Sequence, residues 1–511
     1  MPGLVPDATI LAVDIGTTHC KAGLFALDGT ALKIATRPMV ARRASSGESY
    51  FDPEGLWTST AAVIREVTTS SGTIAVIGIA SMAETGLLID RRTGAVRSFL
   101  VPWFDTAAQT HADLIRSQSN PLERFMKTGL RISFKCSLAK VLWLRARDES
   151  LLNDAIWLSA ADYIAYRLTG KFGTDCSLAG YTFAFRVDQR VWDSDWLREW
   201  HLSPELFPPV HPSGTPIGGV LSDVAASLGL SADIPVAVCG HDHATAAFAL
   251  NVTSPGKVFD SMGTAETLIG ALPERSLTED DFNSGLIYGC HVASGRGYWL
   301  GSLSASGGSV EWLRAQLSHT PLSYDEIDAL LANSSPEPTG ILYFPYLVGS
   351  GPPHTDPLIR GAFVGLSASH GRADLLKAVL EGTVYEVEYI RQIGEHITGQ
   401  PIPVLVTAGG GTRNRAWLQI KADVSSCRIE ASAAPEATLL GAALIAGLGC
   451  GLYASEAEVF NGLSMKPVEV FLPDNERHAV YRRFYEQGYL PLQKVLSHHF
   501  NGKEKKLAEH E

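Results

Sequence analysis

The turn that closes the first apolar run constrains this chain most. Residues 9–32 read TILAVDIGTTHCKAGLFALDGTAL, in which a β-branched run ends in DIGTT (14–18) and a second apolar run starts at once. That second run ends at Asp28-Gly29, a dipeptide typical of β-hairpins. A turn that only reverses the chain needs neither an acidic residue at the end of a buried strand nor two hydroxyl groups behind it. We therefore expect this turn to hold a ligand.

The opening pattern returns once, in the second half of the chain. Residues 257–272, KVFDSMGTAETLIGAL, again read as strand, Gly-Thr turn and strand, with MGT matching the earlier IGT. A repeated unit is the sequence sign of a repeated architecture. Strands, hairpins and helices alternate throughout, which predicts an α/β class with mixed sheets. We expect domains over 1–250 and 251–495, followed by a polar tail over 496–511 that frays.

Paired Gly-Thr turns suit a polyphosphate. Glycine lets backbone N–H groups approach an anion closely, and threonine adds hydroxyl donors. Asp14 would repel phosphates unless a cation lies between them, so it implies Mg²⁺, held directly or through water. The alternative is two ordinary hairpins. The chain contains no GxxxxGK[ST], GxSxG or HExxH, and no GxGxxG follows a strand, which removes several common nucleotide-binding and hydrolase folds.

Charge and cysteine usage narrow the partners. The formal net charge of the 511 residues is −12, which argues against nucleic acids and anionic membranes because both prefer a basic face. The seven cysteines show no CxxC spacing, which suits reduced thiols in the cytoplasm. The uncharged run 437–455 is nearly long enough to span a bilayer, but its glycines favour a buried helix that ends near Ala446.

Helix signals are clear at two places. Asp52 and Pro53 are a good N-cap and first helical residue, and predict a helix from about 53. SAADYIAYRLTG (159–170) runs from a serine cap to a glycine stop. IAVIGIAS (74–81) reads as a buried strand.

Asp242 is the candidate catalytic base. In IPVAVCGHDHATAAFAL (234–250), a buried strand gives way to an alanine-rich helix, and Asp242 stands at the change. Phosphoryl transfer needs one group that accepts the hydroxyl proton, and a strand end points such a group into a cleft. The alternative is that Asp242 caps the helix at Ala244. His241 and His243 also allow a metal site, as in a metal hydrolase.

An ordered set of motifs resembles the FGGY carbohydrate kinases. It comprises AVDIGTT, LSAADYIAYRLTGKFGTD, VCGHDHATAA, FDSMGTAET, FPYLVGSGPPHTDPLIRGAFVGL, LLKAVLEGTVYEVEYI, TAGGGTRNRAWLQIKADV and EATLLGAALIAG, in the family's order from about residue 8 to about residue 490. The resemblance implies two actin-like, ribonuclease-H-type ATPase domains with ATP and sugar in the cleft between them. It also implies transfer of the γ-phosphoryl group of ATP to a sugar hydroxyl with Mg²⁺, and commonly a homodimer.

The resemblance extends to single residues on the nucleotide side. Asp242 falls at the family's catalytic base, and Glu311 stands where glycerol kinase has a glutamine. The residues that resemble the ATP site are Asp14, Gly16, Thr17 and Thr18 in the first phosphate loop, Gly263 and Thr264 in the second, Gly307 and Glu311 beside the nucleotide, and Gly410 and Asn414 on its adenosine side.

On the acceptor side the match is partial. Xylulokinase-like members carry Met-His where this chain has Ala83-Glu84, and glycerol kinase carries Arg-Glu-Thr where it has Ala83-Glu84-Thr85. Trp103 and Asp105 resemble the family's Trp-x-Asp motif and would offer an apolar wall and a hydroxyl acceptor, although Trp103 also suits plain core packing. VGSGPP departs from the family's usual Gly-Glu-Arg-x-Pro, and this changes the predicted lining near the phosphates.

The sequence therefore predicts an ATP-dependent carbohydrate kinase. D-Xylulose is the first candidate acceptor, with glycerol, gluconate and four-carbon polyols as alternatives. A second class, a nucleotide-gated sugar sensor without catalysis, fits the same fold, and the HxH motif keeps a metal hydrolase as a third.

Overall fold

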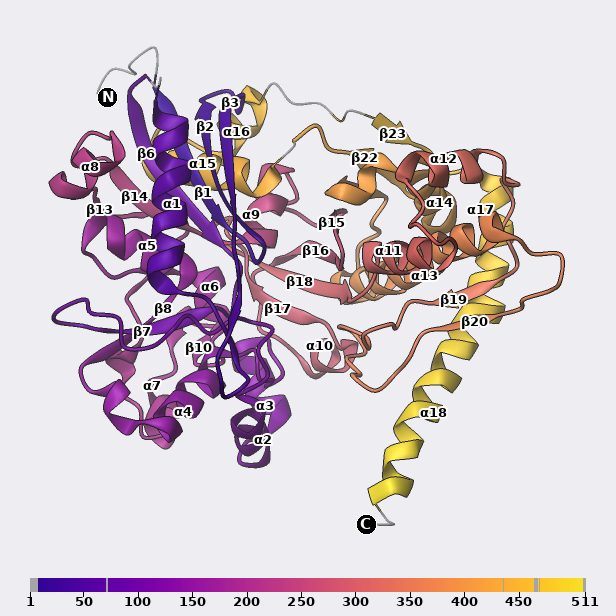
Figure 1. Cartoon of the computed structure of the whole chain (residues 1–511), viewed down its shortest axis with the longest axis horizontal. Coiled ribbons are helices and arrows are strands. Elements are labelled where there is room, and N and C mark those ends of the chain that lie inside the picture. The colour runs from indigo at the N-terminus through magenta and orange to yellow at the C-terminus, as the bar shows by residue number, and fades with distance from the viewer. Residues whose placement is uncertain (1–7, 70–71, 435, 464–466, 468, 509–511) are drawn as a thin grey trace.

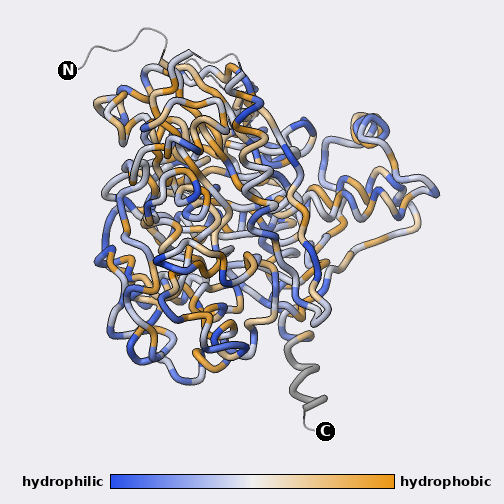
Figure 2. The backbone as a smooth tube through the Cα atoms, turned by 60° about the vertical axis from the view of Figure 1, so that its left-hand side comes forward, coloured by the Kyte–Doolittle hydropathy of each residue, from blue (hydrophilic) through white to orange (hydrophobic). Residues whose placement is uncertain are grey.

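The chain builds two large mixed sheets with helices around each (Figure 1). The computed structural model describes residues 8–69, 72–434, 436–463, 467 and 469–508. Figure 2 shows hydrophobic stretches running through the strands of the first sheet, while hydrophilic stretches lie mostly on outer loops and helices. This pattern places a core beneath each sheet, as expected where helices cover sheet faces.

The first sheet has six strands in the order β13-β14-β6-β1-β2-β3. Its strands are β1 (Thr9–Ile15), β2 (His19–Ala26), β3 (Ala31–Pro38), β6 (Ile74–Ser81), β13 (Pro216–Gly219) and β14 (Pro235–His241). β1 pairs antiparallel with β2 and parallel with β6, which in turn pairs parallel with β14. The register aligns Ile15 with Ser81 and Ser81 with His241. The carboxyl ends of three parallel strands therefore meet at one edge.

The second sheet has seven strands in the order β17-β18-β16-β15-β21-β22-β23. Its strands are β15 (Lys257–Met262), β16 (Glu266–Pro273), β17 (Ile287–Cys290), β18 (Arg296–Leu303), β21 (Val404–Ala408), β22 (Arg428–Ala431) and β23 (Glu469–Phe471). β15 pairs antiparallel with β16 and parallel with β21, as β1 does with β2 and β6. The predicted repeat of strand, Gly-Thr turn and strand is confirmed, and the structure adds a parallel neighbour to each hairpin.

Helices pack around both sheets. In the first half they are α1 (Pro53–Thr68), α2 (Gln109–Ser117), α3 (Pro121–Thr128), α4 (Ser137–Arg147), α5 (Ala160–Thr169), α6 (Cys176–Gly180), α7 (Ser194–Glu199), α8 (Ser222–Leu228) and α9 (Asp242–Ala249). In the second half they are α10 (Glu279–Ser284), α11 (Gly307–Gln316), α12 (Tyr324–Ala332), α13 (Arg372–Thr398), α14 (Arg415–Ser425), α15 (Ala437–Gly449), α16 (Glu456–Gly462), α17 (Asn475–Arg483) and α18 (Leu490–Ala508).

Short elements complete the chain. The small strands are β4 (Arg42–Arg43), β5 (Ser49–Tyr50), β7 (Gly86–Asp90), β8 (Ala155–Ser159), β9 (Thr174–Asp175), β10 (Phe185–Arg186), β11 (Val191–Trp192), β12 (Val210–His211), β19 (Leu342–Phe344) and β20 (Ala362–Val364). The single-turn elements are η1 (Glu149–Leu152), η2 (Pro204–Leu206), η3 (Gly410–Arg413) and η4 (Phe484–Tyr489).

The structure confirms the two helices predicted from local sequence signals. α1 begins at Pro53 with Asp52 as its N-cap residue, although the Asp52 side chain makes no capping hydrogen bond. α5 has a complete capping box between Ser159 and Asp162, and it ends at Gly170 in the left-handed conformation. Both helices therefore follow from local sequence.

Helix α15 lies against the first sheet, although it follows most of the second sheet in the sequence. It packs on β1, β6 and β14 and on helix α9. It runs to Gly449, about one turn past the predicted end near Ala446, and the glycines in that turn let other chain segments approach. A Cβ atom at Gly449 would lie 2.0 Å from the carbonyl oxygen of Gly214. Among the described residues, no helix is long and apolar enough to cross a membrane.

Helix α18 extends through Ala508, and residues 509–511 lie outside the described part. Leu496 and Phe500 on this helix pack against the second core. The predicted fraying of the tail stays a prediction. The predicted boundaries at 250 and 495 stay predictions.

Candidate active site

The first Gly-Thr turn lies between β1 and β2, and Asp14 is buried just before it. The Gly16 N–H donates to the His19 carbonyl at 2.9 Å and closes the turn. Burial, and then the charge of Asp242, raise the pKa of Asp14 to about 7. Its Oδ1 atom is buried with no hydrogen-bond partner among the described residues. A buried carboxylate oxygen without a partner fits the predicted cation beside the phosphates.

The two threonine residues of the first turn lie in different environments. The Thr17 hydroxyl accepts a hydrogen bond from the Trp103 indole N–H at 2.8 Å, whereas Thr18 is exposed. The first phosphate loop and the predicted acceptor wall are therefore in direct contact. Trp103 is half-buried, so it is neither a fully buried core residue nor a surface residue.

The second Gly-Thr turn, residues 263–265, is exposed between β15 and β16. The start of α11 holds its backbone. The Gly307 N–H donates to the Gly263 carbonyl at 3.1 Å, and the Gly308 N–H donates to the Thr264 carbonyl at 2.9 Å. A Cβ atom at Gly307 would lie 2.6 Å from the Gly263 oxygen, so this position requires glycine. The structure thus brings three predicted ATP-site residues together.

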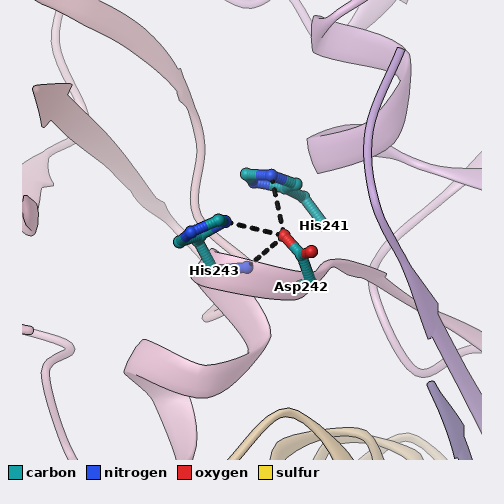
Figure 3. A group of neighbouring side chains, drawn as sticks. All are labelled: His241, Asp242 and His243. Atoms are coloured by element: carbon teal, nitrogen blue, oxygen red, sulfur yellow. Dashed lines mark hydrogen bonds and ion pairs between the residues drawn. The ribbon is translucent and has the colours of Figure 1, made fainter. Parts of the chain in front are cut away.

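Asp242 is the first residue of α9, and His241 is the N-cap residue. Its Oδ1 atom accepts from the His243 backbone N–H at 2.7 Å, which is a bond to the first turn of the helix, and also from the His243 Nδ1 at 2.8 Å and the His241 Nε2 at 3.0 Å (Figure 3). The role of Asp242 as a helix cap and its role as the base therefore both stay predictions. Among the described residues, no hydrogen bond reaches Oδ2. One carboxylate oxygen is fixed and the other is available.

The two imidazoles determine the charge state of Asp242. Burial alone would raise its pKa, but His243 and His241 outweigh burial and hold the pKa well below the usual range. In return Asp242 raises the pKa of His243, against the effect of burial. Asp242 is therefore ionised at neutral pH.

The same three side chains also have the types of ligand atom that a metal site needs. One ligand atom from each of His241, Asp242 and His243 lies within 4.8 Å of the others. Both imidazoles are already hydrogen-bonded to the same Asp242 oxygen, and this bonding accounts for their arrangement.

A cavity of about 210 Å³ joins the two halves of the chain at Asp242. Its lining includes Asp242 and His243 from α9, Phe259 and Ser261 from β15, and Gly409 after β21. The predicted catalytic base therefore opens into the same space as the glycine segment of the nucleotide side.

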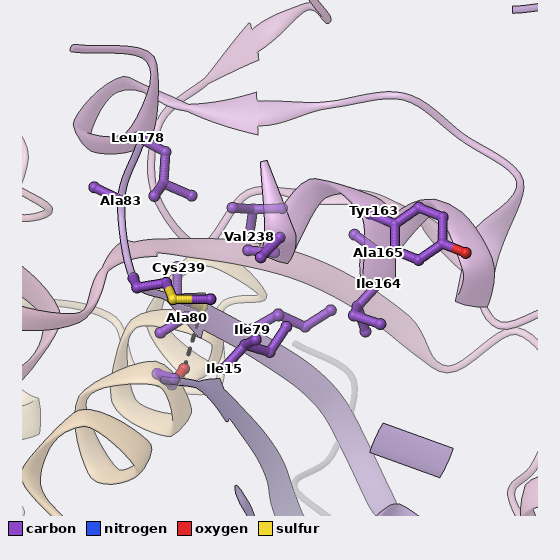
Figure 4. Close-up of a cluster of buried hydrophobic side chains, with 14 of the residues drawn as sticks. Ile15, Ile79, Ala80, Ala83, Tyr163, Ile164, Ala165, Leu178, Val238 and Cys239 are labelled. Carbon is purple, nitrogen blue, oxygen red and sulfur yellow. Dashed lines mark hydrogen bonds between the residues drawn. The ribbon is translucent and has the colours of Figure 1, made fainter. Parts of the chain in front are cut away.

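The strand ends below this cavity rest on a tightly packed core (Figure 4). Ile15 and Ile79 are fully buried, and Cys239 is buried beside them. The Cys239 thiol donates to the Ala442 carbonyl of α15 at 3.3 Å. The residues at the edge of the first sheet are thus mounted on a rigid support, as a catalytic group requires.

Glu84 occupies a strained loop that a buried lysine holds in place. Its φ is +61°, in the left-handed region that non-glycine residues rarely adopt. The fully buried Lys140 ammonium donates to the Glu84 carbonyl and, at 2.9 Å, to the Pro102 carbonyl. Burial lowers the pKa of Lys140 to about 8. Strain of this kind collects at ligand sites.

The Glu84 side chain lies among basic groups. Burial raises its pKa, and Lys135, Lys140 and His241 oppose that rise. The Lys135 ammonium stands 5.0 Å from the Trp103 ring centroid, which places both beside the Glu84 loop. The carboxylate is available to accept hydrogen bonds from hydroxyl groups.

The other predicted acceptor residues are less exposed. Ala83 is buried, and the Thr85 hydroxyl accepts from the Trp103 N–H at 3.1 Å. Asp105 accepts from the Ser49 N–H at 2.6 Å and, through its other oxygen, from the Ala107 N–H at 2.9 Å. Both Asp105 oxygens thus already have backbone partners, and its contact with an acceptor stays a prediction.

The nucleotide end carries the remaining predicted residues. Glu311 pairs with Arg314 at 2.8 Å and accepts from the Tyr324 hydroxyl, so it is already engaged. The Asn414 Oδ1 atom caps α14 through the Trp417 N–H at 2.9 Å. Gly410 has open space where a Cβ would be.

Sequence reasoning missed two buried lysines. Lys140 and Lys421 both have no exposed surface and both bind oxygen atoms next to predicted site loops. The available signal was a single lysine within each of two apolar helical segments, SLAKVLWL and AWLQIKADV.

Comparison with known proteins finds related sequences over both halves of the chain. Residues 9–249 match the N-terminal domain of the FGGY family of carbohydrate kinases, and residues 259–450 match its C-terminal domain. The chain is 30% identical over 497 residues to a glycerol kinase of Gloeobacter violaceus, covering 94% of this chain and 96% of that protein. It is 28% identical over 486 residues to a xylulose kinase of Staphylococcus epidermidis, covering 93% and 95%.

A solved structure shows the same fold. The ligand-bound xylulose kinase from Lactobacillus acidophilus superimposes with a TM-score of 0.88 at 20% identity, covering 97% of this chain and 99% of that chain. The predicted two-domain α/β fold is confirmed.

Proposed function

Because this chain belongs to the FGGY family of carbohydrate kinases, we propose that it transfers the γ-phosphoryl group of ATP to a primary hydroxyl of a sugar or polyol, with Asp242 as base. The observation that carries the proposal is the position of Asp242. It is ionised, fixed through one oxygen, and open to the cavity that also reaches Ser261 and Gly409.

The base acts late in such a reaction. Phosphoryl transfer passes through a loose transition state, so the protein supplies positioning, charge stabilisation and one proton acceptor. Asp242 takes the hydroxyl proton on the oxygen that the imidazoles leave unbound. His241 and His243 hold the carboxylate in place, and their N–H groups keep it ionised.

The two Gly-Thr turns grip the phosphates from opposite halves of the chain. The first offers the backbone of Gly16 and the hydroxyl groups of Thr17 and Thr18, and the second offers Gly263 and Thr264 beside the start of α11. Asp14 fits Mg²⁺, because its buried Oδ1 lacks a partner among the described residues. When bound, Mg²⁺ neutralises phosphate charge that Asp14 would otherwise repel.

The acceptor binds on the first half, against the Glu84 loop. Glu84 accepts hydrogen bonds from hydroxyl groups, and the Trp103 indole covers the C–H face of the sugar. D-Xylulose is the first candidate, and xylulose kinases are among the relatives. Glycerol is the second, because Glu84-Thr85 resembles the glycerol kinase pair and a glycerol kinase is 30% identical. Closing of the two halves excludes water and limits ATP hydrolysis.

A coupled ADP-release assay with a panel of acceptors tests this function. The panel contains D-xylulose, glycerol, gluconate and tetritols, and mass spectrometry identifies the phosphorylated product. A single acceptor with a much higher kcat/KM confirms the proposal. ATP hydrolysis that is independent of every acceptor and gives no phosphorylated product would support the sugar-sensor alternative instead. Zinc or iron that copurifies, with activity lost to a chelator, would support the metal hydrolase.

The assembly and location of the chain complete the proposal. The homodimer and the cytoplasmic location stay predictions, and sedimentation analysis of the full chain tests the first of them.

A further inference from the structure

A fully buried charge cluster lies directly beneath the second phosphate loop. It consists of Asp260 on β15, Glu266 at the start of β16, Lys421 on α14 and Ser306 just before α11, and all four are 0% exposed. The Lys421 ammonium donates to Asp260 at 2.7 Å and also to Glu266. The Ser306 hydroxyl donates to the second oxygen of Glu266. Four elements of the second half thus meet in one network.

The ionic groups of the network face one another and are closed off from solvent. Burial, followed by the charge of Glu266, raises the pKa of Asp260 well above its ordinary value. Burial disfavours the Lys421 cation, but the two carboxyl groups outweigh it and raise the lysine pKa. One buried ammonium group therefore holds two buried carboxyl groups together. Such a cluster is costly to break, because removal of one member leaves an uncompensated buried group.

This cluster lies next to the exposed turn 263–265, on the buried side of the hairpin. Glu266 pairs directly with Met262 across the hairpin, so the turn is suspended between two anchored strands. Ser306, which binds Glu266 through its hydroxyl, donates its backbone N–H to the Thr264 carbonyl at 3.0 Å. Ser306 therefore connects the buried cluster to the phosphate loop, through its side chain on one side and its backbone on the other.

Lys421 extends the same connection to the other end of the nucleotide site. It lies on α14, whose N-terminus is capped by Asn414. Just before that helix, Gly409 packs on the backbone of Met262, where a Cβ would lie 2.6 Å from the Met262 oxygen. The phosphate loop and the predicted adenosine side are therefore braced against each other through Lys421.

The first phosphate loop is built differently. Asp14 lies on the cleft side of its strand, and its Oδ1 lacks a partner within the described residues. Asp260 lies one position further from its glycine than Asp14 does, and strand residues alternate between faces. Its carboxyl group therefore points away from the cleft, where one oxygen accepts from Lys421 and the other, Oδ1, lacks a partner within the described residues. We therefore expect Asp14 to act on the ligand, whereas Asp260 holds the loop in place.

We propose that Lys421, Asp260, Glu266 and Ser306 are positioning residues for ATP, which fix the second phosphate loop and the adenosine-side helix in one geometry. The inference rests on the proposed function, since it concerns the same nucleotide site. None of the four side chains touches the nucleotide. Their effect reaches it through the backbone of residues 263–265.

The test is direct titration of the full chain with Mg·ATP in the absence of any acceptor, together with steady-state kinetics. Ser306→Ala and Glu266→Gln each remove one hydrogen bond of the cluster while they keep the backbone. We expect each to raise the Kd and KM for Mg·ATP about tenfold, and to leave the KM for the acceptor within about twofold. Thermal unfolding checks that the variants are folded.

Glu388→Gln is the matched control. Glu388 forms an ion pair with Arg391 at 2.7 Å on α13 of the same half, and this pair is also buried, though less completely than the cluster. We expect this variant to lose thermal stability and to keep its Mg·ATP affinity within about twofold of the wild type. A Kd that stays within about twofold in Ser306→Ala and Glu266→Gln, or that rises equally in Glu388→Gln, overturns the inference.

The design separates this inference from the proposed function. A wild-type chain that binds Mg·ATP, and whose affinity depends on the cluster, supports the inference even if no acceptor is phosphorylated. An active kinase whose cluster variants bind Mg·ATP normally refutes the inference alone. A wild-type chain that does not bind Mg·ATP refutes both.

Discussion

Replacement of Asp242 by asparagine separates proton transfer from everything else that the residue does. The Oδ1 atom of Asp242 accepts three N–H bonds from His241 and His243, and an asparagine amide oxygen accepts the same three. Asparagine would then present its NH₂ group where Oδ2 faces the cavity. The substitution therefore preserves the local hydrogen bonds but removes the negative charge and the capacity to take a proton.

The expected loss follows from the size of general-base catalysis. A positioned base contributes about 10²–10⁴ in rate, which corresponds to about 3–5 kcal/mol of transition-state stabilisation. We expect Asp242→Asn to lower kcat by this factor. The Kd for Mg·ATP should remain within about twofold, because both phosphate loops are held by other residues. Asp242→Ala, which also loses the hydrogen bonds, should be at least as slow.

The pH profile supplies a second measurement. The imidazoles hold the Asp242 pKa well below the usual range, so the carboxylate is ionised both above and below neutrality. A group whose pKa is depressed loses its function only as the pH falls through that low value. We therefore expect no loss of kcat from Asp242 between about pH 5 and about pH 9.

Two results would refute this reasoning. If Asp242→Asn retains kcat within about tenfold of the wild type, Asp242 is not the base. Alternatively, the variant loses Mg·ATP affinity in proportion to kcat, and then the residue acts through binding. Single-turnover measurements at saturating ATP and acceptor distinguish these outcomes from a change in product release.

Three further substitutions test other parts of the site and the fold. Thr264→Val removes a hydroxyl of the second phosphate loop and should raise the KM for ATP about tenfold without changing the KM for the acceptor; an effect confined to the acceptor KM contradicts the assignment. Glu84→Gln should raise the acceptor KM and leave the Kd for Mg·ATP unchanged, which titration without acceptor measures. Gly441→Ala places a Cβ 2.0 Å from the Thr245 carbonyl between α15 and α9, and should cost about 1–3 kcal/mol in chemical denaturation. Gly462→Ala, a control with nothing within 4 Å of its Cβ, should leave the free energy of unfolding unchanged or slightly higher, and equal losses in both variants contradict the packing argument.

Much of the fold follows from short-range sequence. The strand-turn-strand pattern at 9–27 and its echo at 257–272 predicted both hairpins, because apolar runs and the glycine turns that join them are local properties of the sequence. The capping box of α5 is equally local. The end of α15 was not predictable in this way. Its terminal glycines read as helix breakers, but they pack against a distant segment at Gly214 that local sequence does not reveal.

In the candidate site, too, some features follow from the sequence and others only from the tertiary structure. The sequence alone determined the residue types that phosphoryl transfer needs, since two Gly-Thr turns, an acidic residue before the first of them and an aspartate at a strand end are readable in order along the chain. The tertiary structure decided how each acid is used. Asp14 faces the cleft, Asp242 is shared by two imidazoles, and Asp260 is neutralised by Lys421, which lies 161 positions away. The charge and proton affinity of a carboxyl group depend on burial and on neighbours brought together by folding, and for that physical reason no stretch of sequence fixes them.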